Sequence, residues 1–304
     1  RRSDALLDFD HDINESEIAN NSDVGGQIIG AESYQASCIA GMAHEDYLEI
    51  DAASSSALKT IYTHSPAHYR CEKAQGFKPT KAMQMGTAIH CGILEPELFD
   101  DLVAVQPEVN KRTNAGKAEF AAFEAENEGK IILTEIEMLH VVRAIESVGK
   151  HAGAQALLTS GGRPELSLFW QDNRTRVHCK ARFDFLRDDM MAVDLKTTDD
   201  ASPRAFARTI VNFEYPMQAA HYWSGAEHVF NESLRAWAWI AIERQPPYGV
   251  AVYTCPANVI AAAMYKVSTA LDQYEQAKSS GWWESYTEEI HPAPIPNFYT
   301  RVRD

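Results

Sequence analysis

The fold is decided by two neighbouring stretches of the sequence, His178-Cys-Lys-Ala-Arg-Phe-Asp-Phe-Leu-Arg187 and Met191-Ala-Val-Asp-Leu-Lys196. Apolar and polar residues alternate in both stretches, and a period of two is typical of β-strands. We expect strands over 175–187 and 191–197. The acidic residues between them favour a tight turn, so the two strands are expected to form an antiparallel hairpin.

This hairpin would gather three charged side chains. Alternation places Asp184 on the face opposite Phe183 and Phe185, and it places Asp194 and Lys196 side by side on the second strand. Carboxylate oxygens hold Mg²⁺ while leaving positions for water and phosphate oxygens, and a lysine can orient or deprotonate the attacking water. The group suits phosphodiester hydrolysis, although a bare Asp-x-Lys pattern also occurs at solvated strand edges.

The rest of the chain shows an α/β pattern. Helices are expected over 54–63, from Ser65-Pro66, and over 80–94, 114–128 and 134–149, the last opened by a capping box of Thr134 and Glu137. Further strands are expected over 165–171, 234–243 and 248–254, and further helices after Ser202-Pro203, over 216–230 and over 256–278. We therefore expect a central mixed sheet flanked by helices, with an N-terminal helical layer.

We expect one domain behind an acidic arm. The arm would cover 1–45, and the domain 46–304 would comprise a helical front part (46–160), a catalytic sheet with its helices (161–280) and an irregular tail (281–304). Residues 1–50 contain two arginines and eleven acidic residues, so they carry nine of the fifteen net negative charges. The segment 52–94 has five basic residues and one acidic residue, so a polyanion could bind there despite the acidic total.

Composition excludes several classes of protein. The longest apolar run, Ala236 to Ile242, is much shorter than the roughly 20 residues of a membrane helix, and no apolar leader opens the chain. We expect a cytoplasmic protein without a membrane partner. The five cysteines are scattered without a C-x-x-C pair, which excludes a disulfide framework and an iron–sulfur cluster.

Several segments carry a family resemblance. Asp184 followed by Asp194-Leu195-Lys196 resembles the core of the PD-(D/E)xK nuclease superfamily, with Phe183 in place of the usual proline. Gly86-Thr-Ala-Ile-His90 and Gln218-Ala-Ala-His-Tyr222 resemble the G-x-x-x-H and Q-x-x-x-Y helices of the RecB-like branch. The resemblance implies a restriction-endonuclease-like fold.

Three further segments resemble narrower groups. The segments Ser54 to Lys59 and Ser65-Pro-Ala-His-Tyr69 are similar to the leading serine and C-P-x-x-F elements of the RecB-like branch. Gly92-Ile-Leu-Glu-Pro-Glu97 and Arg112-Thr-Asn-Ala-Gly-Lys117 look like RecE-type exonucleases (exonuclease VIII). The resemblance covers about residues 50–280 in the expected order.

The resemblance implies a metal site. Asp184, Asp194 and the carbonyl of Leu195 would ligate Mg²⁺, with Mn²⁺ as a substitute, and His90 would join or flank the metal. Lys196 would serve the nucleophilic water. Without the resemblance, His90 would be interpreted as an interior histidine.

Three further residues are candidates for catalytic roles. Glu165 would add a carboxylate from the neighbouring strand. Gln218 and Tyr222 lie four residues apart on one helix face, so both can point at the same site, where they would hold Lys196, the scissile phosphate or a flanking nucleotide. Packing of Tyr222 on the sheet, and a capping or solvent-facing Gln218, remain the alternatives.

The candidate DNA-binding residues lie in two places. The 5′ phosphate would be held by Ser54, Ser55 and Ser56 with Arg70. Arg112 and Lys117 would grip the duplex backbone, or they are ordinary surface charges.

The resemblance implies an exonuclease. It would degrade one strand of linear double-stranded DNA from its ends in the 5′→3′ direction with Mg²⁺, and it would leave 3′ overhangs for recombination by strand annealing. A RecT-like annealing protein and a homo-oligomeric ring, a tetramer or a trimer, would be its partners. The alternatives are a PD-(D/E)xK endonuclease and a catalytically silent scaffold that binds DNA ends.

Overall fold

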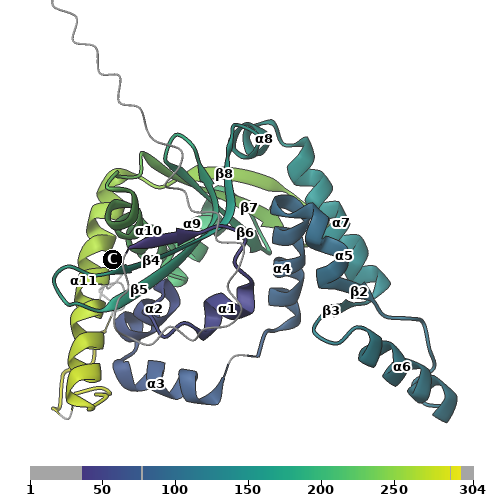
Figure 1. Cartoon of the computed structure of the whole chain (residues 1–304), viewed down its shortest axis with the longest axis horizontal. Coiled ribbons are helices and arrows are strands. Elements are labelled where there is room, and N and C mark those ends of the chain that lie inside the picture. The colour runs from purple at the N-terminus through teal and green to yellow at the C-terminus, as the bar shows by residue number, and fades with distance from the viewer. Residues whose placement is uncertain (1–35, 77, 288, 296–304) are drawn as a thin grey trace, which may run out of the picture. The chain divides into compact units, whose positions relative to one another are not determined.

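A six-stranded mixed sheet forms the centre of the computed structural model, which describes residues 36–76, 78–287 and 289–295 (Figure 1). In spatial order its strands are β1 (Ser37–Ile39), β4 (Gly162–Gln171), β5 (His178–Arg187), β6 (Met191–Thr198), β7 (Ala236–Glu243) and β8 (Val250–Thr254). Neighbours are antiparallel except β6 and β7, which are parallel. The expected hairpin of β5 and β6 and the expected mixed sheet are confirmed.

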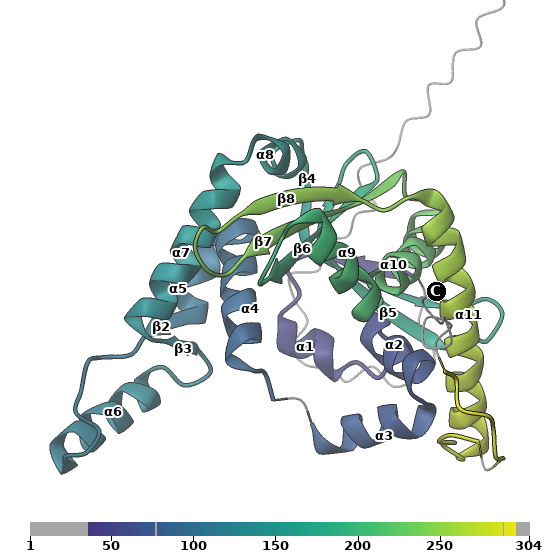
Figure 2. The same cartoon turned by 180° about the vertical axis from the view of Figure 1, so that it is seen from behind.

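Helices flank this sheet, as the two opposite views in Figures 1 and 2 show. They are α1 (His44–Glu49), α2 (Ser55–Thr63), α3 (Pro66–Gln75), α4 (Lys81–Leu94), α5 (Phe99–Leu102), α6 (Asn114–Glu126), α7 (Glu135–Lys150), α8 (Ala152–Leu158), α9 (Pro203–Asn212), α10 (Tyr215–Phe230) and α11 (Ala257–Ser280). A 3₁₀ turn, Pro96–Leu98, precedes α5, and β2 (Val103–Val105) pairs with β3 (Ile131–Leu133) in a small parallel sheet. Within the described residues, no helix is long and apolar enough to cross a membrane.

Four of the described helices begin where the sequence predicts and have a side chain that accepts from one of their first backbone N–H groups. Ser54 caps α2, Ser65 caps α3 and Thr80 caps α4. The predicted capping box of Thr134 and Glu137 at α7 is confirmed. The sequence analysis missed the short elements α1, α5, α8, β1, β2 and β3, which are too short to show a periodic pattern.

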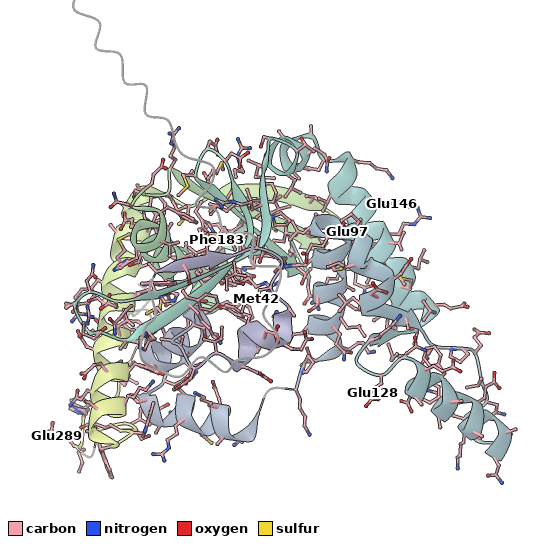
Figure 3. The ribbon with its side chains drawn as sticks, viewed as in Figure 1. Met42, Glu97, Glu128, Glu146, Phe183 and Glu289 are labelled. Carbon is pink, nitrogen blue, oxygen red and sulfur yellow. The ribbon has the colours of Figure 1, made fainter. Side chains whose placement is uncertain are left out.

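Two apolar clusters cover the two faces of the sheet. Alternation along β7 separates them: Trp237 and Trp239 belong to a cluster with α2, α10 and α11, whereas Ile240 and Ile242 belong to a cluster with α4 and α7. Phe183, labelled in Figure 3, lies in the first cluster. The sheet is therefore buried on both sides.

The expected alternation of β5 is wrong at one point. Phe183 and Phe185 were expected on one face, but Phe183 lies in the first cluster and Phe185 in the second. The change of phase occurs at Asp184, and the β4–β5 register omits Asp184 and Glu165 between the pairs Pro164↔Phe185 and Leu166↔Phe183. Glu165 has a φ of 44°, a left-handed conformation that interrupts the extended backbone. The irregularity lies where the sequence predicts chemistry.

The predicted arm, 1–45, joins the sheet in its described part. Ser37–Ile39 forms β1 and pairs with β4, and α1 follows before residue 50. A boundary at 45 therefore assigns too much of the chain to the arm, and residues 1–35 lie outside the described residues. The described part of the tail after 281 has no helix or strand, as expected.

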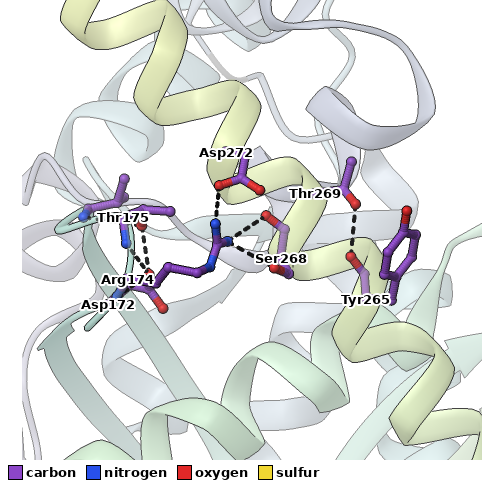
Figure 4. A network of polar contacts seen from close by, with 8 residues as sticks. Asp172, Arg174, Thr175, Tyr265, Ser268, Thr269 and Asp272 are labelled. Carbon is purple, nitrogen blue, oxygen red and sulfur yellow. Dashed lines mark hydrogen bonds and ion pairs between the residues drawn. The ribbon is translucent and has the colours of Figure 1, made fainter.

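A polar network fastens the loop between β4 and β5 to α11 (Figure 4). Arg174 of the loop donates to the Asp272 carboxylate and, over 2.8 Å, to the Ser268 hydroxyl. Asp172 accepts from the Thr175 hydroxyl over 2.7 Å, which closes the loop itself. The loop and the helix are held by charge-assisted bonds at the surface.

Close packing of α10 on β4 gives a first prediction. A methyl group at Gly225 would lie 2.8 Å from two ring atoms of the buried Trp170, so Gly225→Ala is expected to lower the free energy of unfolding by about 1–3 kcal/mol. Gly149→Ala, on α7, meets open space and is expected to raise it by about 0.5–1 kcal/mol. Denaturant unfolding of both variants measures this, and a Gly225→Ala variant as stable as the wild type would contradict the packing.

Candidate active site

The candidate site lies where β5 and β6 separate. Their ladder contains only the pairs Phe185↔Val193 and Leu186↔Ala192. Beyond it, the backbone N–H of Leu195 donates to Oδ2 of Asp184 over 2.7 Å, so a side chain takes the place of the opposite strand's carbonyl. The separation leaves room for chemistry between two strands that pair at only two positions.

Three side chains from separate elements converge beside this gap. His90 of α4, Glu165 of β4 and Asp184 of β5 each offer a ligand atom, and the three atoms lie within 4.8 Å of one another. His90 Nδ1 is 3.6 Å from Asp184 Oδ2. All three residues are half-buried. One imidazole and two carboxylates match the ligands that divalent cations take in proteins.

Electrostatics favour the ligand form of His90. Burial, followed by the charge of Lys196, lowers the pKa of His90 to about 4, while Asp194 and the Leu195 backbone act in the opposite direction. The imidazole is neutral at pH 7, with a lone pair free to coordinate.

The carboxyl groups lack sufficient positive charge around them. Burial, followed by the charge of Asp184, raises the pKa of Glu165 to about 7 against the opposing effect of Arg182. Burial likewise raises the pKa of Asp184, although Lys196 and the Leu195 N–H act in the opposite direction. A divalent cation would supply the missing charge, so the donor set fits such an ion.

Asp194 and Lys196 form an ion pair next to this group. Lys196 Nζ lies 2.5 Å from Asp194 Oδ2, and Gln218 Nε2 donates to the other oxygen of Asp194 over 2.7 Å. Burial raises the pKa of Asp194 to about 6 against the effect of Lys196. Burial alone would lower the pKa of Lys196, but Asp194 and Asp184 outweigh it, so the pKa is raised and the amine is a cation at neutral pH.

The site residues expected from the sequence are therefore only partly brought together. His90, Glu165 and Asp184 form the described group of possible ligands, and the Leu195 carbonyl faces His90. Asp194 lies outside that group of three and binds Lys196 and Gln218 instead.

Tyr222 packs on the sheet next to the carboxyl groups of the site. Its ring contacts Phe183 edge-on, with the centroids 5.1 Å apart, and contacts Trp237 at 5.7 Å. Burial raises its pKa well above the usual range, so its hydroxyl stays protonated. The side chain supports the strand that carries Asp184.

The candidate DNA-binding residues lie on other elements. Ser54 caps α2 by accepting from the Ala57 N–H and contacts the hydroxyl of Ser56, while Ser55 is buried. Arg70 of α3 lies over the Trp283 ring in a pocket of about 400 Å³ formed with the segment after α11. Arg112, just before α6, and Lys117, within α6, are both exposed. This helix projects away from the sheet in both views (Figures 1 and 2).

Sequence reasoning missed three residues next to the site. Arg182 Nε donates to Glu165 Oε2 over 2.7 Å, and its Nη1 is buried without a hydrogen-bond partner among the described residues. Lys196 Nζ lies 4.9 Å from the centre of the Tyr215 ring. Burial, followed by the charge of Lys196, lowers the pKa of Lys59 to about 8. Two signals were available in the sequence. Arg182 lies two positions before Asp184 on the same strand, and Tyr215 lies about one helical turn before Gln218.

Comparison with known proteins agrees with this geometry. Residues 54–292 match the model of a family described as a PDDEXK-like domain of unknown function, DUF3799. The chain belongs to this PDDEXK-like family. The expected PD-(D/E)xK resemblance and fold are thereby confirmed.

A solved structure of low sequence identity shares the fold of this PDDEXK-like protein. The structure of a "putative exonuclease" from Eubacterium rectale aligns with a TM-score of 0.58 at 13% identity, over 86% of this chain and 94% of that chain. A phage-related exonuclease from Haemophilus somnus aligns with a TM-score of 0.32 at 11% identity, over 78% of this chain and 99% of that chain. No curated protein matches the sequence.

The buried carboxylates give a second prediction. Burial raises the pKa of Asp184, and it raises the pKa values of Glu165 and Asp194 to about 7 and about 6. The folded state therefore ionises these groups at higher pH than the unfolded state does, so the metal-free protein loses stability as the pH rises from the ordinary carboxyl range up through these raised values. Asp184→Asn removes one of these charges while its amide oxygen can still accept from Leu195. In EDTA at pH 8 the variant is expected to melt above the wild type, by about 2–4 °C for each kcal/mol gained, and the difference is expected to shrink at pH 5.

The matched control is Glu124→Gln, which removes an exposed carboxylate on α6. Its melting temperature is expected to stay that of the wild type at both pH values. An Asp184→Asn variant that melts below the wild type at pH 8 would show that the Asp184 charge stabilises the free protein.

Proposed function

We propose that this protein is a Mg²⁺-dependent exodeoxyribonuclease. It degrades one strand of linear double-stranded DNA in the 5′→3′ direction and leaves a 3′ single-stranded overhang. The observation that carries the proposal is the convergence of His90, Glu165 and Asp184 at the gap between β5 and β6, directly beside the Asp194–Lys196 pair. Membership of the PDDEXK-like family and the fold shared with the Eubacterium rectale protein support it.

The site residues fall into two groups: those that would hold the metal and those that would act on the phosphate. His90, Glu165 and Asp184, with the Leu195 carbonyl and Asp194 beside them, would hold the metal. Bound Mg²⁺, or Mn²⁺ in its place, supplies a Lewis acid that polarises the scissile phosphate and activates water.

Lys196 acts as a cation at the reacting phosphate. Its raised pKa keeps it protonated at neutral pH, so it stabilises the negative charge that develops on the phosphate oxygens. Gln218 fixes the Asp194 carboxylate, and Asp194 in turn fixes Lys196. Arg182 fixes Glu165. These hydrogen bonds and ion pairs keep the charged groups in place before the substrate binds.

The RecE-type resemblance extends the proposal to partners. The enzyme acts in the cytoplasm on linear duplex ends, as a homo-oligomeric ring that retains its duplex, and it passes the overhang to a RecT-like annealing protein for recombination. A ring needs only moderate phosphate contacts, which suits a chain with a net charge of −15. The proposed contacts to DNA are Ser54, Ser55, Ser56 and Arg70 at the 5′ phosphate and Arg112 and Lys117 on the duplex.

Removal of the lysine tests the proposed chemistry. Lys196→Ala is expected to lower kcat on linear duplex by about 10²–10³-fold, because it removes a charge aimed at the transition state, while Mn²⁺ binding persists. Lys150→Ala, a lysine whose side chain is 77% exposed on α7, is the control and is expected to keep full activity. Undiminished digestion by Lys196→Ala would remove the proposed mechanism.

The same assay separates the alternatives. Duplexes labelled at the 5′ or the 3′ end, and closed circular DNA, are digested with Mg²⁺ and again with EDTA. Early release of the 5′ label from linear DNA alone supports the proposal. Cleavage of circles would indicate an endonuclease, and DNA-end binding without cleavage would indicate a scaffold.

Proton competition at the carboxylates gives a prediction for metal binding. Glu165, with a pKa of about 7, and Asp194, with a pKa of about 6, take up protons below neutrality, whereas His90 stays neutral down to about pH 4. Mn²⁺ affinity, measured by electron paramagnetic resonance, is expected to fall from pH 8 to pH 5.5, by up to about tenfold per pH unit for each proton released. Glu165→Gln is expected to bind Mn²⁺ more weakly and with a flatter pH profile. An affinity that is independent of pH would place the metal elsewhere.

A further inference from the structure

An exposed aromatic side chain lies one ring away from the candidate catalytic lysine. Phe213 ends α9 with 61% of its surface exposed. Its ring stacks on Tyr215, with the centroids 5.8 Å apart and the planes at 19°. Tyr215 in turn lies 4.9 Å from Lys196 Nζ. A continuous path of contacts therefore runs from the proposed reacting centre to an apolar ring in solvent.

The turn that presents Phe213 is held firmly. Glu214, the next residue, has a φ of 48°, which is unfavourable for a residue other than glycine. Lys266 of α11 binds both Glu214 carboxylate oxygens, over 2.7 and 2.8 Å. The Phe213 N–H donates to the Thr209 carbonyl over 3.0 Å. The surrounding structure thus enforces a strained turn that keeps an aromatic ring in water.

The supporting ring is anchored in the core. Tyr215 contacts Phe206, with the centroids 6.2 Å apart, and Trp239 at 6.5 Å. Phe206 and Trp239 are buried. Tyr215 therefore forms a rigid base under Phe213, and Val211, 67% exposed, adds apolar surface from the last turn of α9.

Positive charge lies at the inner end of this path. Lys196 is there, and Lys59 of α2 is near enough for Lys196, Asp194 and Glu214 all to act on its charge. A ligand that spans the path needs an anionic group at the lysines and a flat aromatic group on Phe213. A nucleotide has both, because its phosphate is anionic and its base stacks on aromatic rings regardless of sequence.

We propose that Phe213, supported by Tyr215, is a stacking site for the nucleobase that flanks the scissile phosphate. The inference rests on the proposed nuclease function and adds a residue that positions the substrate. The stacked base would fix the strand relative to Lys196, so the phosphate enters the reacting centre in a defined position.

Binding to DNA with and without the base tests this site. The cleavage-deficient Asp184→Asn protein is titrated with fluorescent 5′-phosphorylated duplex DNA that carries either normal nucleotides or tetrahydrofuran abasic residues at its 5′ end. Abasic DNA is expected to bind about 5- to 100-fold more weakly. Adding Phe213→Ala is expected to weaken binding of normal DNA by the same factor and to leave binding of abasic DNA unchanged.

Two further variants keep the result specific. Phe213→Trp retains a stacking ring and is expected to retain the preference for normal DNA. Ile136→Ala, which shortens a side chain 69% exposed on α7, is expected to change nothing. Repeating the titration with single-stranded DNA tells whether the stacked base belongs to an unpaired strand or to a terminal base pair.

Four outcomes would overturn the inference. A Phe213→Ala variant that weakens normal and abasic DNA equally would show that no base is recognised there. A variant that changes the oligomeric state in sedimentation, with DNA binding intact, would make Phe213 a contact between copies of the chain. Absence of DNA binding and cleavage in the parent protein would overturn the proposed function as well, whereas cleavage without base dependence would overturn the stacking site alone.

Discussion

The site depends on one hydrogen bond, in which the Leu195 backbone N–H donates to the Asp184 carboxylate. In a continuous antiparallel ladder that N–H would bond to a carbonyl of β5, and the two strands would leave no space between them. A side-chain acceptor satisfies the buried N–H while the strands separate. The left-handed backbone of Glu165 lies opposite the same point in β4 and brings a second carboxylate to the gap.

This arrangement keeps ionisable groups in an environment that opposes their charges. Burial raises the pKa values of Glu165 and Asp194, and the available cations, Arg182 and Lys196, compensate only in part. The fold can accommodate these unfavourable buried charges because large apolar clusters on both faces of the sheet hold the strands in place. A site with too little positive charge is suited to bind a divalent cation, which can in turn hold a phosphodiester. The buried carboxylates that destabilise the metal-free protein are therefore the groups that the proposed function needs.

Much of the fold could be predicted from the sequence because its signals are local. Capping residues placed the starts of α2, α3, α4 and α7, and alternation placed β5 and β6. Prediction failed where long-range contacts decide the conformation. β1 pairs with the edge of β4, and Phe185 changes face at the point where the β4–β5 ladder is interrupted and Glu165 has a left-handed backbone. Neither feature produces a hydrophobic period or a biased composition in the sequence from which it could be predicted. At the site, Arg182, Tyr215 and Lys59 were missed for the same reason, because their positions depend on neighbours that are distant in sequence.

The sequence by itself determined which chemical groups are available and on which elements they lie, since hairpin spacing and helix caps act over a few residues. Asp184, Asp194 and Lys196 were singled out in this way, whereas His90 was singled out only by the family resemblance. Only the tertiary structure decided how these groups are combined: Asp184 joins His90 and Glu165, whereas Asp194 is held by Lys196 and Gln218. The reason is that distances between side chains on separate strands and helices depend on how those elements pack, and no spacing along the chain encodes the gap between β5 and β6.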